Sequence, residues 1–235
     1  MANRGPIPIE DVQNFKYLGS PINPKGEALS EIQSHISAAW AAFIKLRKCL
    51  WLRNEIFPRT KLRIYNALVL SVVLYGCETW PLRAGEPNNL NVFHHKCIRC
   101  ILGLRLSDRD RNDVIRRRCG YIPLVSDVVK ARRLRWFEHT LRQLDDSFSK
   151  QCLKCQPLAH WKKKPGGQKK TWLSTVRADL EPMGGFKRHG HRWNRLWIQL
   201  IEPIALEREQ WRDTCRQILD ATMGLDKDRT WPKYK

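Results

Sequence analysis

Three side chains in the second half of the chain have the spacing of part of a zinc site. Cys152 and Cys155 are separated by two residues, and His160 follows after a further short segment. A tetrahedral zinc ion needs four nitrogen or sulfur ligands, whereas residues 163–165, where a fourth ligand should follow, are two lysines and a proline. The spacing therefore favours no bound metal or other cofactor, and a zinc-stabilised domain is kept as an alternative.

The carboxylates and thiols do not form a recognisable catalytic set. Asp145 and Asp146 are adjacent, but they follow a predicted helix, and two-metal chemistry needs converging carboxylates for which the sequence shows no second candidate. Cys49, Cys77 and Cys119 lie in or beside apolar runs and have no neighbouring histidine to activate them. We therefore predict no catalytic residue in this chain.

Positive charge is the strongest chemical signal in the sequence. The 235 residues include 43 lysines and arginines against 23 acids, which gives a formal net charge of +20. Such an excess is typical of proteins that bind nucleic acid, and exposed indoles beside basic residues can stack on unpaired bases. The residues predicted to contact nucleic acid are Lys162, Lys163, Lys164, Lys169, Lys170, Arg132, Arg133 and Arg135. Two alternatives remain: solvated charge on a helical protein-interaction module, and tryptophans that serve only as core.

The hydropathy pattern argues against a membrane protein. No apolar run approaches the roughly 20 residues that a membrane-spanning helix needs. The first residues, MANRGPIPIEDV, lack the apolar stretch of a signal peptide, so the sequence predicts an intracellular protein, nuclear or cytoplasmic. In such a compartment the eight cysteines are expected to be reduced.

An apolar segment at residues 60–80 is the element around which the chain is organised. It contains no proline or glycine before Gly76, which makes it too long for one strand. Pro58 suits the first turn of a helix and Gly76 suits its end. Because this helix is apolar nearly all round, it is expected to lie buried in the core. An amphipathic helix over residues 28–51 is its natural partner.

The remaining pattern predicts a mainly α-helical protein with a short N-terminal β-hairpin. The aromatic residues and turn residues of 12–23 indicate that hairpin, and helices are expected from 88 to 102, from 107 to 119 and from 126 onward. Residues 145–170 have the composition of a basic linker. The predicted units are 1–26, 27–87, 88–144, 145–170 and a tryptophan-rich helical tail at 171–235.

Five short segments, taken in order, identify a family resemblance. They are FKYLG at 15–19, TKLRIYNALVLSVVLYGCETW at 60–80, FHHKCIRCILG at 93–103, RRLRWFEHTLR at 132–142 and KKTW at 169–172. The series resembles the C-terminal part of a non-LTR (LINE-type) retrotransposon reverse transcriptase. The resemblance implies that residues 27–87 are similar to the polymerase thumb and residues 88 onward to the C-terminal region of that family.

The resemblance also implies roles for single residues and for partners. Phe15, Tyr17, Leu18 and Gly19 match the hairpin that follows the palm and grips the primer end. The palm's aromatic-x-Asp-Asp motif, which holds the catalytic metals in this family, is absent from the chain. The resemblance therefore implies a polymerase fragment without activity of its own, which binds RNA, DNA or their hybrid and has the missing palm as a further partner.

Overall fold

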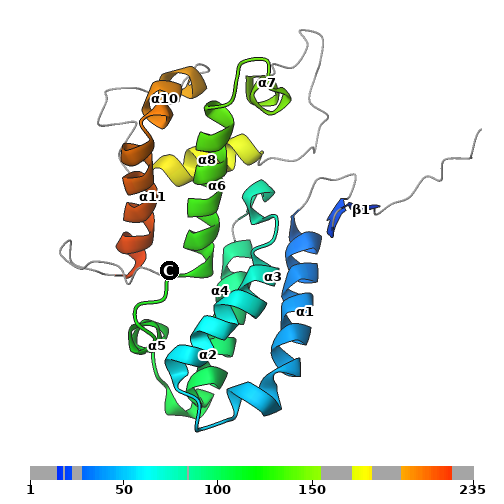
Figure 1. Ribbon diagram of the computed structural model, residues 1–235, viewed down its shortest axis with the longest axis vertical. Helices are drawn as coiled ribbons and strands as arrows, with labels where there is room; N and C mark the ends of the chain where they lie inside the picture. The colour runs from blue at the N-terminus through cyan, green and yellow to red at the C-terminus, as the bar shows by residue number, and fades with distance from the viewer. Residues whose placement is uncertain are drawn as a thin grey trace, which may run out of the picture.

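The structure is a computed structural model, and it describes residues 15–17, 19–22, 28–83, 85–154, 171–181 and 197–223. Helices make up most of these residues (Figure 1), which confirms the prediction of a mainly α-helical chain. The helices form two groups that share one long helix, α6, which runs through the middle of the molecule.

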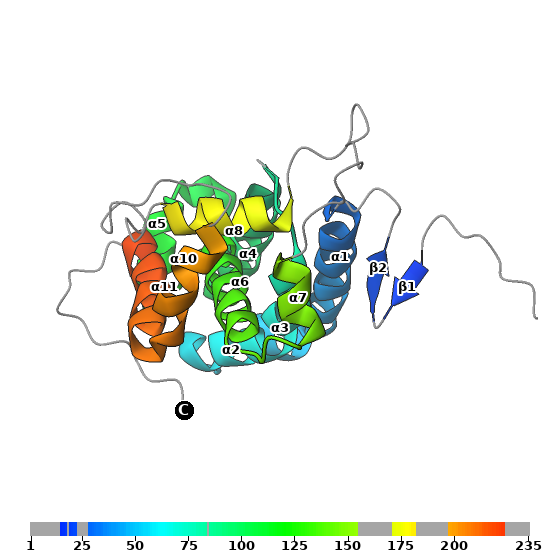
Figure 2. The same cartoon turned by 90° about the horizontal axis from the view of Figure 1, so that it is seen from above.

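Two three-residue strands precede the helices. Strands β1 (Phe15–Tyr17) and β2 (Ser20–Ile22) pair antiparallel (Figure 2). Between them, Gly19 has a φ of +94°, in the left-handed region that glycine adopts without strain. Most of the predicted unit 1–26 lies outside the described residues, so the hairpin unit stays a prediction.

The predicted amphipathic helix is confirmed as α1 (Leu29–Lys45), followed by a π-helical segment, η1 (Arg47–Trp51). The apolar segment after it is also helical, and it consists of α2 (Pro58–Tyr65), the π-helical η2 (Asn66–Leu70) and α3 (Ser71–Val73). It begins at Pro58, as the sequence predicts, and its last helix ends at Val73, three residues before Gly76, whose φ is +66°. Helix α1 packs along η2 and α3.

The expectation that this apolar helix is buried all round is wrong. Val69 and Val73 are fully buried, but Leu68 is 51% exposed and Tyr75 is 52% exposed. Helices α1 and α4 cover one side of the segment. Hydrophobic composition shows that a helix can be buried, but the number of neighbouring helices decides how much of its surface is covered.

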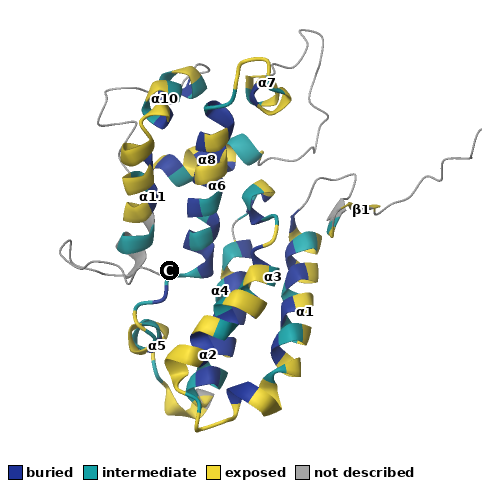
Figure 3. Cartoon of the chain, in the orientation of Figure 1, coloured by how far each residue is buried: buried dark blue, intermediate teal, exposed yellow. Residues whose placement is uncertain are grey.

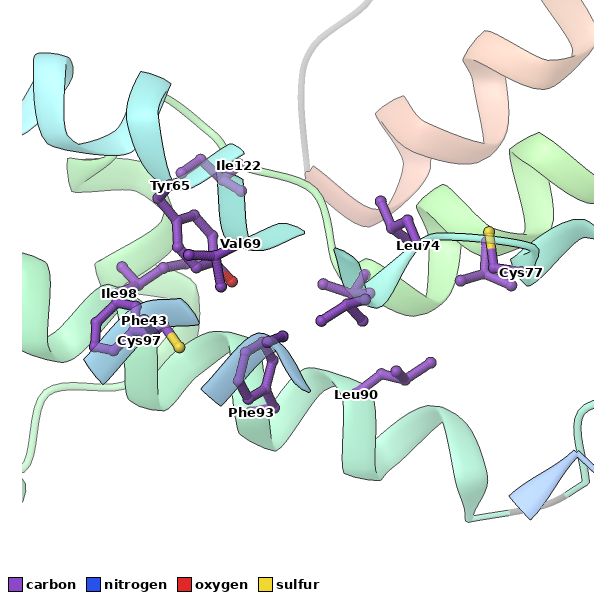
Figure 4. Packing of buried hydrophobic residues seen from close by; sticks show 14 of the residues in the cluster. Phe43, Tyr65, Val69, Leu74, Cys77, Leu90, Phe93, Cys97, Ile98 and Ile122 are labelled. Atoms are coloured by element: carbon purple, nitrogen blue, oxygen red, sulfur yellow. The ribbon is translucent and has the colours of Figure 1, made fainter. Parts of the chain in front are cut away.

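The first hydrophobic core joins the α1–α3 segment to α4 (Glu86–Leu102) and α5 (Asn112–Arg118). Figure 4 shows Phe43, Tyr65 and Ile98 among the side chains packed there. Helix α4 confirms the helix predicted over 88–102, whereas α5 is shorter than the predicted helix over 107–119. The short 3-10 turns η3 (Cys77–Thr79) and η4 (Leu106–Asp108) connect these helices.

A second hydrophobic core lies around the C-terminal half of α6 (Val125–Leu141). Leu134, Phe137 and Leu141 are fully buried there. They pack with side chains from three later helices, which are α8 (Trp172–Leu180), α10 (Trp197–Leu206) and α11 (Arg208–Met223). Helix α7 (Phe148–Lys154) lies beside the end of α6.

The two cores meet inside α6. Val125 and Val129 belong to the first core, and Leu134 begins the second. The predicted units end elsewhere, at residues 87 and 144, and those boundaries stay predictions. No helix in the described part of the chain is both long enough and apolar enough to cross a bilayer.

Candidate nucleic-acid interface

An exposed cluster of cations lies where α1 ends and α2 begins, at the lower end of the molecule in Figure 1. Residues 45–63 contain seven lysines and arginines but only one acid, Glu55. Six of these cations are exposed, and exposed residues are coloured yellow in Figure 3. We name this surface the basic corner, and its cations are Lys45, Arg47, Lys48, Arg53, Arg59 and Arg63.

Trp51 fixes the backbone of the basic corner. Its indole stacks on the ring of Phe43 with 4.9 Å between the ring centroids, and its Nε1 donates a hydrogen bond of 2.7 Å to the carbonyl oxygen of Phe43. The seventh cation, Lys61, is buried and donates from Nζ to the carbonyl oxygen of Trp51 at 2.9 Å. These contacts tie the end of α1 to the start of α2, so the exposed cations extend from an ordered backbone.

The charge of the basic corner is not compensated by nearby acids. None of its six cations forms an ion pair with another residue in the described ranges. The arginines around α5 differ, because Arg118 pairs with Asp110 while Arg111 and Arg117 share Asp113. An uncompensated cluster attracts a polyanion more strongly than a paired one.

Three apolar side chains are exposed in the same segment. Ile44 is 61% exposed, Leu52 is 55% exposed and Phe57 is 79% exposed. A single exposed hydrophobic residue is ordinary. Three exposed apolar side chains in a segment with six exposed cations, however, form a mixed basic and apolar surface. Such a surface suits a phosphate backbone with a stacked or packed base, and it also suits an acidic protein partner.

The structure places the predicted arginines of α6 in different environments. Arg135 is exposed, whereas Arg132 donates to the carbonyl oxygen of Leu74 at 3.1 Å and lies 3.6 Å from Glu78. Arg133 is only 1% exposed and forms an ion pair with Asp179 on α8. A buried guanidinium cannot reach a phosphate, which corrects the prediction for Arg133 and makes it a structural residue.

Several other predicted site residues lie outside the described residues. They are all five lysines of residues 162–170 and Leu18 of the predicted primer-grip set. Phe15 and Tyr17 are exposed, and Gly19 lies close to Tyr75, whose ring Cε1 would be 3.7 Å from a Cβ built on that glycine. These placements leave the primer-grip assignment a prediction.

Of the three residues of the weak zinc candidate site, the structure describes only the first. Cys152 is exposed on α7, while Cys155 and His160 lie outside the described residues. Within the described ranges, no three histidine, cysteine or acidic side chains are grouped closely enough to hold a metal ion. The zinc alternative therefore stays a prediction for residues 152–160.

The buried thiols and histidine of the two cores do not resemble activated catalytic groups. Burial raises the pKa of the Cys77 thiol to about 12 and that of Cys215 to about 11, so both thiols are protonated at neutral pH. Burial also lowers the pKa of His94 to about 3, and its Nδ1 lies 2.9 Å from the hydroxyl of Tyr65. These groups pack inside the protein, away from any surface substrate.

The basic corner is absent from the set of residues predicted from sequence. Residues 1–90 as a whole contain eleven cations and seven acids, an average that hides the local excess. The cations at 45–48 also suit the C-terminal end of a helix dipole, which supplies an ordinary structural explanation for them. A charge count in a window of about 20 residues would have revealed the cluster.

Comparison with known proteins yields one informative similarity. No protein-family model matches the chain, and no solved structure matches it. The chain is 25% identical over 214 residues to an uncharacterized transposon-derived protein of Caenorhabditis elegans, and the aligned region covers 89% of this chain and 72% of the worm protein. This similarity suggests a transposon-related origin for the chain.

Proposed function

We propose that this chain is the C-terminal part of a non-LTR retrotransposon reverse transcriptase, or descends from one, and that it binds nucleic acid without catalysis. The ordered sequence segments support the family, and the similarity to a transposon-derived protein agrees with it. In this proposal the helices of residues 27–87 act as a thumb, and the missing palm supplies the catalytic carboxylates.

The observation that carries the proposed binding is the uncompensated charge of the basic corner. Lysine and arginine side chains neutralise phosphates and release the counterions condensed on the nucleic acid, which drives association without reading sequence. RNA, DNA and their hybrid all offer this backbone. The lysines of 162–170, together with Arg132 and Arg135, are proposed as further contacts, and Phe15, Tyr17, Leu18 and Gly19 as a primer-grip-like turn.

The proposal is tested by removing charge from the basic corner while measuring the salt dependence of binding. Replacing Arg47, Lys48 and Arg53 with glutamine should lower the slope of log affinity against log salt by about 0.7 to 0.9 for each phosphate that is no longer neutralised. Affinity for unrelated sequences should fall by a similar factor, because these cations bind the backbone. Fluorescence anisotropy with labelled duplex, single strand and hybrid at several salt concentrations gives both quantities.

A matched control removes the same amount of charge elsewhere. Arg111, Arg117 and Arg118 around α5 are also exposed but are paired with acids, so their replacement by glutamine should change the slope much less. Equal reductions of affinity in the two triple variants would show that net charge alone matters and would contradict a binding site at the basic corner.

A second candidate function rests on the exposed apolar residues of the same surface. Ile44, Leu52 and Phe57 would suit a helical module that binds an acidic protein partner. In that case the purified chain of 235 residues would bind none of the three nucleic acids with a steep salt dependence.

A further inference from the structure

Trp136 is the most exposed tryptophan in the described part of the chain, with 44% of its surface accessible. The other described tryptophans have a structural explanation. Trp51 and Trp80 are fully buried, and Trp172 donates from Nε1 to the carbonyl oxygen of Glu78 at 2.7 Å. Trp211 is buried and donates from Nε1 to the carbonyl oxygen of Leu134 at 3.1 Å.

The indole of Trp136 lies on a helix face that turns away from the second core. Its neighbours on α6, Leu134 and Phe137, are fully buried, whereas Arg135 and His139 are exposed like Trp136 itself. The rings of Trp136 and His139 are 5.6 Å apart and tilted by 37°. At about 100° per residue, positions 132, 136 and 139 fall on one stripe of the helix, and it is roughly 10 Å long.

The charge beside this stripe is positive. Arg135 flanks the indole, while Arg132, one turn before it, lies 3.6 Å from Glu78, so Arg135 is the cation offered to a phosphate. The two acids of α6, Asp127 and Glu138, are buried and paired with Lys130 and Arg142, so neither opposes a phosphate at this face. An exposed aromatic ring between cations is the arrangement that single-strand-binding proteins use, because the ring stacks on a base while the cations neutralise the backbone.

We propose that the stripe around Trp136 binds single-stranded nucleic acid, with the indole stacked on an unpaired base and Arg135 at the adjacent phosphate. Bases inside a duplex are already stacked on their neighbours, so this contact distinguishes single strands from duplexes, which the basic corner does not. The inference rests on the proposed function, since it assigns the stripe a distinct role within the same nucleic-acid binding.

The test compares Trp136→Ala with Trp136→Phe in the full chain. Stacking on one base predicts that the alanine variant binds a short labelled single strand about 5- to 150-fold more weakly. It should bind a blunt duplex of the same length as the wild type does, and its salt slope should be unchanged. The phenylalanine variant should recover much of the affinity, because it keeps an aromatic face.

Leu144→Ala is the matched control, because Leu144 is an exposed apolar residue just beyond the end of α6. It should leave both affinities unchanged, and thermal melting of each variant checks that the fold is intact. Single-strand affinity that is unchanged in Trp136→Ala, or that falls equally for strand and duplex, would overturn the inference while leaving the basic corner in place. A wild-type chain that binds neither probe would overturn the proposed function first.

Discussion

The buried pair Tyr65 and His94 shows how the first core handles polar groups at the scale of single residues. The hydroxyl of Tyr65 and Nδ1 of His94 form a hydrogen bond in a site from which water is excluded. Burial raises the pKa of Tyr65 and lowers that of His94 to about 3, so both side chains are neutral at pH 7. The pair therefore stabilises the fold only while the imidazole stays uncharged.

Stability should consequently fall as the pH drops below about 6.5. Between about pH 3 and 6.5 the unfolded state binds a proton at His94 that the folded state does not, so the free energy of unfolding decreases with falling pH. The slope from this residue approaches about 1.4 kcal/mol per pH unit. Urea denaturation at several pH values should show a shallower dependence for His94→Gln than for the wild type. An identical dependence in the two proteins would mean that His94 titrates normally in the folded state.

At the scale of elements, the helical segment from Pro58 to Gly76 is covered on one side and open on the other. Val69, Val73 and Leu74 face the first core, while Leu68 lies on the open side. Leu70 lies between these extremes, because it is only partly buried against the core. The sensitivity of this segment to substitution should therefore depend on the helical face rather than on hydrophobicity.

Three leucine-to-alanine variants test this sidedness. Leu74→Ala removes a buried side chain and should lower the free energy of unfolding by about 2–5 kcal/mol. Leu70→Ala should cost less than Leu74→Ala, and Leu68→Ala should stay within about 0.5 kcal/mol of the wild type, as surface substitutions usually do. Chemical denaturation of the three variants gives the order. Equal destabilisation at Leu68 and Leu74 would show that a further part of the chain or a second molecule covers the open side.

Sequence patterns predict the ends of these elements better than their surroundings. Pro58 and Gly76 act locally, through a fixed φ and a left-handed turn, so the sequence around them places the helix start and a stop within three residues of the last helical residue, Val73. The buried side of the helix depends on α1 and α4, which come from other parts of the chain. Arg133 shows the same limit at the site, because it belongs to a basic run yet pairs with Asp179, 46 residues away.

The whole molecule is connected through α6 and a few long-range contacts. Arg132 on α6 donates to the carbonyl oxygen of Leu74, and Trp172 on α8 donates to that of Glu78. Helices α6 and α8 therefore both bind the end of the apolar segment. The buried ion pair between Arg133 and Asp179 fixes α8 against α6. These contacts predict that the two cores unfold together.

Breaking the buried ion pair should destabilise the molecule as a whole. Arg133→Met leaves the largely buried carboxylate of Asp179 without its guanidinium and should cost about 3–5 kcal/mol. Adding Asp179→Leu removes the buried carboxylate as well, so the double variant should recover part of that stability. Thermal unfolding should be followed by far-UV circular dichroism for the helices and by near-UV circular dichroism for the packed aromatic rings. The two signals should show one coincident transition in each protein. Separate transitions for the two probes would indicate that the cores unfold independently.

The sharing of α6 between the cores also determines the order in which the chain can fold during synthesis. Among the described residues, the last fully buried member of the first core is Val129, whereas the second core includes residues as far as Cys215, so the second leaves the ribosome later. In the interval, Leu134, Phe137 and Leu141 lack the helices α8, α10 and α11 that cover them in the complete fold. A nascent chain of this length exposes an apolar stripe of the kind that promotes aggregation until the later helices emerge.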